Sequence, residues 1–293
     1  MGRMPTTTLD SARWRAAWDE VMTGFVPGLS ALEAAIAVAA DAALGRPPFR
    51  VLDLGGGPGV VAERMSARWP EAAVTMVDID PVLLALARDG VPPAVSVLTA
   101  DLGEPLPALL PAASNGWSAD AGSAAAGSNG LDATGSWASG NGLAAGGRSE
   151  ATHGSAASDG YDLITAVMTV HYLRPERIRA LYRRCHQVMA PGGLLVVADL
   201  MPDDGLPSLM SALNPAPGEA AAELAWVQWW GEVGEAPEFA RLMELRADVF
   251  RDRPPADFAG SVAWHGAAVR AAGFREAGLL WRDGRHAALA AVA

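Results

Sequence analysis

The chain has 293 residues, 51% of them hydrophobic, and a formal net charge of −11, so it can bury the core of one large α/β domain with additions or of two small domains. The acidic balance argues against a nucleic-acid partner, and the lack of any apolar run near ~20 residues or of a secretory signal predicts a cytoplasmic protein with no membrane partner. Cys185 is the single cysteine, which excludes a disulfide framework and a cysteine-rich metal site, so we predict no metal.

The first 45 residues predict a helical segment ahead of the main domain, which we place at residues 46–293. Apolar residues at helical spacing run through residues 10–44. Within this stretch Ser30 and Glu33 have the form of a capping box, which predicts that a helix starts with Ser30 at its N-cap. Gly45 and the prolines that follow it are typical of a helix end.

The next part of the chain alternates between strand and helix patterns. Helical patterns lie at 60–69, 82–88 and 175–190, between apolar segments that read as strands at 50–54, 73–77, 94–99, 162–170 and 194–199. Strands that are apolar nearly throughout predict a parallel sheet covered on both faces. Two extended runs flank Asp283-Gly284 and predict a terminal hairpin. The expected fold is a Rossmann-like α/β domain: a mainly parallel seven-stranded sheet with a C-terminal antiparallel hairpin and helices on both faces.

Two segments interrupt this plan. Residues 111–160 are dominated by Gly, Ser, Ala, Asn and Asp without periodicity, which predicts a flexible insertion. The alternative is a cover that orders on substrate binding, because Trp117 and Trp137 lie inside it. Residues 201–257 hold helical patterns between prolines and follow the fifth strand, where open α/β sheets bind ligands. We therefore predict a helical cap over the site.

The most informative motif is Asp-Leu-Gly-Gly-Gly-Pro-Gly at residues 53–59, between a buried strand and a helix. Glycines let the backbone approach a ligand closely, and helix-terminal N–H groups can serve as donors. The dinucleotide pattern needs a sixth-position glycine, where this chain has Val60, and no Gly-Lys-Ser/Thr follows. A tight turn without function is the simpler alternative. The spacing, however, resembles the nucleoside-binding loop of class I S-adenosylmethionine-dependent methyltransferases, which implies cofactor contacts from Asp53, Gly55, Gly56, Gly57, Pro58 and Gly59.

The resemblance also implies roles for residues that follow the next strands. In that family an acidic residue ending the second strand holds both ribose hydroxyls, and Asp78 occupies that place, with Ile79 packing on the adenine. Asp101, after the third strand, matches the residue that meets the adenine amino group. Each carboxylate could instead be a turn or capping residue. Leu102 and Met168 complete the set of expected cofactor-binding residues.

Methyl transfer from a sulfonium is an in-line displacement that requires alignment and exclusion of water. An oxygen or nitrogen acceptor can also need a base, and His171, after the fourth strand, is the candidate because its ordinary pKa of ~6.5 suits that role. A narrower, partial resemblance to plant-type small-molecule O-methyltransferases implies the same role, although Tyr172-Leu173 replaces their usual Asp-Trp. His171 could otherwise pack on the cofactor or be structural. Asp199, which ends the fifth strand, either faces the substrate or caps a loop.

The sequence thus predicts an S-adenosylmethionine-dependent enzyme that methylates a small, partly apolar molecule, at oxygen. The alternatives are a catalytically inactive cofactor-binding or regulatory module, a protein- or RNA-directed methyltransferase, and a nicotinamide-dependent oxidoreductase, which the glycine spacing disfavours. The oligomeric state stays open. Six aromatic residues are candidates for an apolar acceptor pocket, or equally for the core: Trp14, Trp18, Phe25, Trp226, Trp229 and Trp230.

Overall fold

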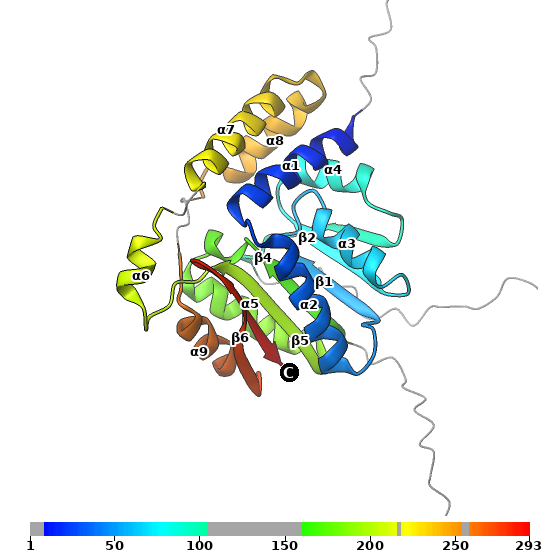
Figure 1. The fold of residues 1–293 in the computed structure, drawn as a ribbon. Helices are drawn as coiled ribbons and strands as arrows, with labels where there is room; N and C mark the ends of the chain where they lie inside the picture. The colour runs from blue at the N-terminus through cyan, green and yellow to red at the C-terminus, as the bar shows by residue number, and fades with distance from the viewer. Residues whose placement is uncertain (1–8, 105–159, 216–217, 254–257) are drawn as a thin grey trace, which may run out of the picture.

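A seven-stranded sheet forms the centre of the protein, described here by a computed structural model that covers residues 9–104, 160–215, 218–253 and 258–293 (Figure 1). Its strands are β1 (Arg50–Leu54), β2 (Ala73–Asp78), β3 (Val95–Thr99), β4 (Tyr161–Val167), β5 (Met189–Leu200), β6 (Glu276–Asp283) and β7 (His286–Val292). The strand order is β3-β2-β1-β4-β5-β7-β6. Neighbouring strands are parallel from β3 to β5, and β7 is antiparallel to both β5 and β6. The predicted fold class is confirmed.

Helices cover both faces of this sheet. One face carries α2 (Leu29–Leu44), α3 (Val60–Arg68) and α4 (Pro81–Gly90), and the other carries α5 (Pro175–Val188) and α9 (Val262–Ala272). In β1, Val51 is buried toward the first layer, and Leu52 and Leu54 toward the second. Burial on both faces explains why the central strands are continuous apolar runs instead of alternating ones.

The N-terminal stretch is two helices, α1 (Ser11–Phe25) and α2, bent by 91° relative to each other. The predicted capping box is wrong, because α2 begins at Leu29 with Gly28 as its N-cap, and Ser30 lies inside the helix. Pro27 disfavours helical backbone at Val26, and this turn overrides the local Ser–Glu signal. Within the described residues no single helix has the length and apolar character to cross a bilayer; α1 and α2 meet those criteria only when joined.

The ends of β4 and β5 also differ from the prediction. β4 ends at Val167 instead of Val170, because Met168 takes a left-handed backbone with φ of 50°. The chain then forms a short 3-10 helix, η1 (Val170–Tyr172), which carries His171. β5 starts at Met189 instead of Leu194, and a register shift against β4 accommodates the extra residues.

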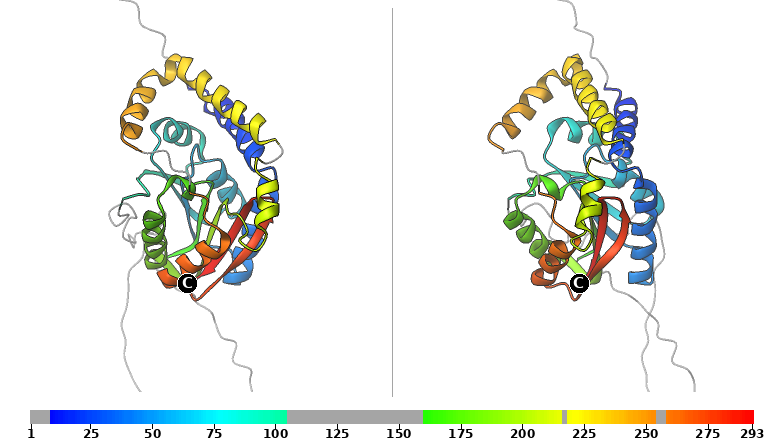
Figure 2. Two further views of the ribbon diagram at one scale, coloured as in Figure 1. Left: turned by 90° about the vertical axis from the view of Figure 1, so that its left-hand side faces the viewer. Right: turned by 60° about the vertical axis from the view of Figure 1, so that its left-hand side comes forward.

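The segment after β5 contains α6 (Pro207–Ala212), α7 (Glu219–Glu235), η2 (Pro237–Phe239) and α8 (Ala240–Phe250). Figure 2 shows α7 running alongside α1, and α8 packs against α4. The predicted insertion at 111–160 lies outside the described residues, except for Gly160.

Candidate active site

The glycine-rich loop joins β1 to α3 in a backbone conformation that would be strained for residues other than glycine. Gly55, Gly57 and Gly59 all have positive φ, between 55° and 83°. A Cβ on Gly55 would lie 2.3 Å from the side chain of Thr169, so this position also has no room for one. At Gly57, by contrast, the nearest atom to a built Cβ is the Trp18 indole nitrogen, 3.8 Å away. The backbone of Gly57 is therefore the part of the loop that a ligand can approach closely.

Asp78 joins the end of β2 to this loop. One carboxylate oxygen accepts the N–H of Gly57 at 2.8 Å, and the other accepts those of Ile79 and Asp80 at 2.7 and 2.9 Å. Burial raises the pKa of Asp78, and the three backbone N–H groups oppose that rise. Each carboxylate oxygen has two lone pairs, so one acceptor position remains, on the oxygen that accepts from Gly57. Its place beside Gly57 fits the ribose-binding role that the sequence implied.

Asp53 lies beneath the loop and is only 1% exposed. Its Oδ1 accepts a hydrogen bond from the Thr165 hydroxyl at 2.8 Å, and its Oδ2 has no hydrogen-bond partner among the described residues. A Cβ on Gly56 would come within 2.8 Å of Oδ2. Burial raises the pKa of Asp53 to about 6. Asp53 therefore packs against the backbone of the glycine loop at Gly56. Direct contact between Asp53 and the cofactor stays a prediction.

Arg15 of α1 holds the other side of the loop. Its side chain is buried and donates to the carbonyls of Pro58 at 2.8 Å and Gly90 at 2.7 Å, with a longer bond to Gly59. It also pairs with Glu63 of α3. Arg15 thus holds the backbone carbonyls of Pro58 and Gly59, a role that no sequence motif around Arg15 indicates.

Asp101 follows β3 and already has a partner. It accepts the N–H of Gly103 at 2.8 Å and forms an ion pair with Arg253, which comes from the segment after α8. Burial alone would raise the pKa of Asp101, but the Arg253 hydrogen bond outweighs it and lowers the pKa. Leu102 packs against the core on the α5 side. The sequence did not indicate the Arg253 contact.

His171 and Asp199 form a hydrogen-bonded pair at the carboxyl ends of β4 and β5. The imidazole Nδ1 lies 2.7 Å from Asp199 Oδ1, and Asp199 also accepts the backbone N–H groups of Thr169, His171 and Leu200. Asp199 is 2% exposed and His171 17%. With the Nδ1 proton donated to Asp199, Nε2 is left as an acceptor, the tautomer that a general base needs. Asp199 therefore both caps η1 and orients the histidine.

Tyr172 connects the two halves of the site. Its ring centroid lies 4.0 Å from that of His171. Partial loss of water around the hydroxyl raises the pKa of Tyr172, the negative charges of Asp199 and Asp78 add to the rise, and Arg246 of α8 opposes it. The Tyr172 residue is 61% exposed, so it lies at the surface beside His171. Met168, with its strained backbone, lies directly between β4 and η1.

The six aromatic candidates divide into core and site residues. Trp14 and Trp229 are buried together with Phe239 in the core between α1 and α7. Trp18 is half-buried and reaches Gly57, and it packs edge-on against Trp229 and Trp230. Phe25 and Trp226 are half-buried at the margin of the same cluster. Trp18 is therefore the aromatic candidate closest to the glycine loop.

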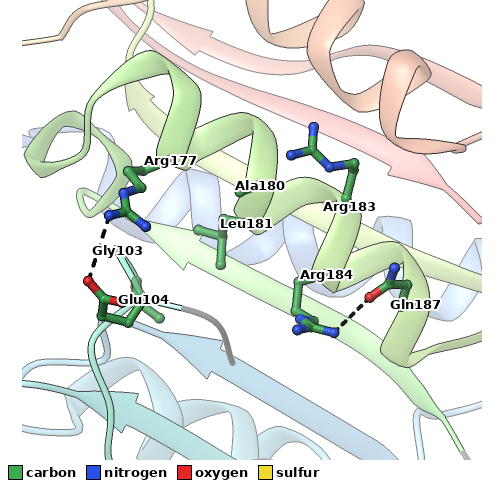
Figure 3. A pocket seen from close by; sticks show the side chains of 9 residues that line it. Gly103, Glu104, Arg177, Ala180, Leu181, Arg183, Arg184 and Gln187 are labelled. Carbon is green, nitrogen blue, oxygen red and sulfur yellow. Dashed lines mark hydrogen bonds and ion pairs between the residues drawn. The ribbon is translucent and has the colours of Figure 1, made fainter. Parts of the chain in front are cut away.

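A cavity lies beside α5, away from the glycine loop. It has a volume of about 270 Å³, and no residue of the glycine loop lines it. Figure 3 shows Arg177 directed at Glu104 and Arg184 at Gln187 along α5 on its wall. In the described part of the chain no three His, Cys, Asp or Glu side chains are grouped as metal ligands.

A family model for a methyltransferase domain matches residues 29–247, about three quarters of the chain. That interval contains the glycine loop, Asp78, Asp101, His171 and Asp199. The chain therefore belongs to the methyltransferase-domain family, a class I S-adenosylmethionine-dependent methyltransferase family.

Individual relatives match in part. A trans-aconitate 2-methyltransferase from Methylobacterium nodulans is 46% identical over 67 residues, 22% of this chain and 26% of that protein. An O-methyltransferase family protein from Burkholderia thailandensis has a TM-score of 0.50 at 14% identity and covers 95% of this chain. Human N-acetylserotonin methyltransferase in complex with SAM has a TM-score of 0.47 at 14% identity and covers 99%. This chain spans 59% and 60% of those two structures.

Proposed function

We propose that this protein uses S-adenosylmethionine to methylate a small molecule at an oxygen atom, with His171 as the general base. The observation that carries the proposal is the His171–Asp199 pair, next to the glycine loop and Asp78 on the same edge of the sheet. When bound, the cofactor would supply a sulfonium methyl group, which would pass to the acceptor oxygen in an in-line displacement with S-adenosylhomocysteine as the leaving group.

The loop, Asp78 and Asp101 are the residues that would hold the cofactor. The open space at Gly57 accommodates close approach of a ligand to the backbone, and Asp78 presents a fixed carboxylate beside it. Asp101 lies at the end of the adjacent strand, β3, where the adenine amino group is expected. The open backbone at Gly57 and the oriented carboxylates of Asp78 and Asp101 therefore support binding of a nucleoside.

His171 would take the proton from the acceptor hydroxyl at Nε2. Asp199 holds the ring through Nδ1 and would stabilise the imidazolium that forms. Because Asp199 is buried and accepts three backbone N–H groups as well, the base is held in one orientation before the acceptor arrives. Trp18 and Tyr172 lie nearby, which favours a partly apolar acceptor. The name of the Methylobacterium relative supports a small acceptor.

Calorimetry of the purified protein with S-adenosylhomocysteine and NADH tests the cofactor site. We expect micromolar binding of the first and none of NADH, and Asp78→Ala should lose most of that affinity. Asp41→Ala is a matched control, because Asp41 is a carboxylate on α2 that pairs with Arg68 and Trp69 away from the loop. Binding of NADH alone would overturn the assignment.

Turnover with a panel of phenols, aliphatic alcohols and carboxylic acids tests the base. His171→Gln should lower kcat by about 10²–10⁴ while the affinity for S-adenosylhomocysteine is retained. Asp199→Asn should lower kcat and change its pH profile, whereas His186→Gln on α5 should not. Unchanged kcat in His171→Gln would refute the base, and would be the result for a carboxylate acceptor, which has no proton to lose at neutral pH. Cofactor binding without turnover on any acceptor would favour the inactive module.

A further inference from the structure

Helix α8 is attached to the rest of the protein with little burial of its side chains. None of its residues between Ala240 and Phe250 is fully buried, whereas α5 and α9 each bury four. It packs against α4 and α7. Leu242 and Met243 pack, partly buried, against the aromatic core between α1 and α7. An element with so little apolar burial opens at low free-energy cost, so polar contacts contribute much of its attachment.

Two arginines supply those contacts. Arg246 donates to Asp80 at 2.6 Å, and Arg253, seven residues on, pairs with Asp101. Arg246 lies within α8, and Arg253 lies in the short segment that directly follows it, so the two arginines hold the helix and its C-terminal end. Phe250 lies between them, with its ring 4.9 Å from the Arg246 guanidinium and 5.8 Å from that of Arg253.

The two carboxylates mark the edge of the proposed cofactor site. Asp80 follows the presumed ribose ligand Asp78 by two residues, and it also caps α4 through two backbone N–H groups. Asp101 is the residue expected to meet the adenine. α8 and the segment directly after it are therefore fastened to residues that follow β2 and β3, and the other ion pairs of α8 among the described residues are with its own carboxylates.

We propose that α8 is a hinged cover for the adenosine end of the cofactor site, closed by the Arg246–Asp80 and Arg253–Asp101 ion pairs. The inference rests on the proposed function, because it takes the ligand to be S-adenosylmethionine. Both arginines and Asp101 are partly exposed, although Asp80 is buried. Ion pairs with exposed members contribute little stability, so this cover can open to admit the cofactor and close over it.

Held closed in this way, the cover slows departure of the bound nucleoside. Arg246 also stacks on Trp230 of α7 at 3.8 Å, which ties the cover to the aromatic cluster that contains Trp18. Arg253 lowers the pKa of Asp101, so closure of the cover favours the ionised form of that carboxyl group.

The test is binding and dissociation of S-adenosylhomocysteine, measured by calorimetry and by stopped-flow tryptophan fluorescence. The variant is Arg246→Gln with Arg253→Gln. The control is Arg241→Gln with Arg251→Gln, which removes the same charge from α8 and its C-cap. Among the described residues those arginines form ion pairs with Glu244 and Asp248 of α8. We expect dissociation about tenfold faster in the variant and within about twofold of the wild type in the control. Lysine at both positions should restore part of the difference.

Salt separates a cover from a merely structural role. Raising salt from ~0.05 M to ~0.5 M should speed dissociation from the wild type and from the control, and not from the variant. Hydrogen exchange of the wild-type protein provides a measurement that needs no variant: salt should deprotect α8 selectively, and S-adenosylhomocysteine should protect it. Equal dissociation from variant and control, or no salt effect on α8, would overturn the cover while leaving the proposed function intact. A wild type that does not bind S-adenosylhomocysteine would overturn both.

Discussion

Asp53 and His265 should give the folded protein opposite responses to pH. Asp53 is buried on the α2–α3 side of the sheet, and burial raises its pKa from 3.8 to about 6. The folded state therefore keeps a proton that the unfolded chain releases. Stability from this group is fully present below pH 3.8 and is lost as the pH rises through about 6. The loss amounts to about 3 kcal/mol, at about 1.4 kcal/mol for each pKa unit.

His265 acts in the opposite sense on the other face of the sheet. It is 1% exposed and lies 2.6 Å from the hydroxyl of Tyr182. Burial lowers its pKa from 6.5 to about 4, against the weaker effect of the Asp199 charge. Here the unfolded chain takes up a proton that the folded state does not, so stability is lost as the pH falls from 6.5 through about 4. The magnitude is again about 3 kcal/mol.

The two contributions nearly cancel between pH 4 and pH 6, and single substitutions should separate them. Asp53→Asn removes the first and should leave a protein whose stability rises with pH by about 3 kcal/mol more than that of the wild type. His265→Gln, which can still accept from Tyr182, should fall by about 3 kcal/mol more than the wild type over the same range. Titrating groups without a charge interaction with Asp53 or His265 contribute equally to all three proteins, and the coupled ones are Asp78, Glu33 and Asp199.

Urea unfolding followed by circular dichroism across this range measures the free energy of unfolding of each protein. In Asp53→Asn the buried NH₂ group that replaces Oδ2 lacks a partner, which costs about 1–3 kcal/mol of stability at every pH. The test is therefore the slope of the unfolding free energy against pH, and not its absolute value. Curves for Asp53→Asn and wild type that run parallel would refute the raised pKa of Asp53. Parallel curves for His265→Gln would do the same for His265.

Three further outcomes follow from packing. Gly55→Ala would place a methyl group against Thr169 and should abolish S-adenosylhomocysteine binding or folding, whereas Gly192→Ala, with positive φ but open space, should cost only about 1 kcal/mol in thermal unfolding. Arg15→Met leaves loop carbonyls unpaired and should destabilise the protein by about 3 kcal/mol; a loss under 1 kcal/mol would contradict it. Burial raises the pKa of Cys185 to about 12, so the folded protein should not react with a thiol reagent at pH ~8 until denatured.

The sheet and the glycine loop could be predicted because their signals are local. Each central strand is a short apolar run, and residues 53–59 carry their conformational requirement in their own glycines. The capping box at Ser30 failed for a local reason too, since Pro27 turns the chain just before it and Gly28 takes the N-cap.

The contacts that complete the site could not be predicted, because they join residues far apart in the chain. His171 and Asp199 are 28 residues apart, and Arg253 and Asp101 are 152 apart. A lone arginine in a helix gives no indication of the carboxylate it will meet. From the sequence, Asp199 either faces the substrate or caps a loop; in the fold it caps η1 and orients His171, and contact with the substrate stays a prediction.

The attachment of His171 to Asp199 has a consequence for engineering. His171 is hydrogen-bonded to Asp199 of β5, which also accepts three backbone N–H groups. Helices α7 and α8 belong to a different segment, which follows β5 in the chain. Exchanging residues 207–250 for the equivalent helices of a homologue should alter which acceptor is selected without displacing the proton acceptor. Chemistry and selectivity can then be inherited, or redesigned, independently.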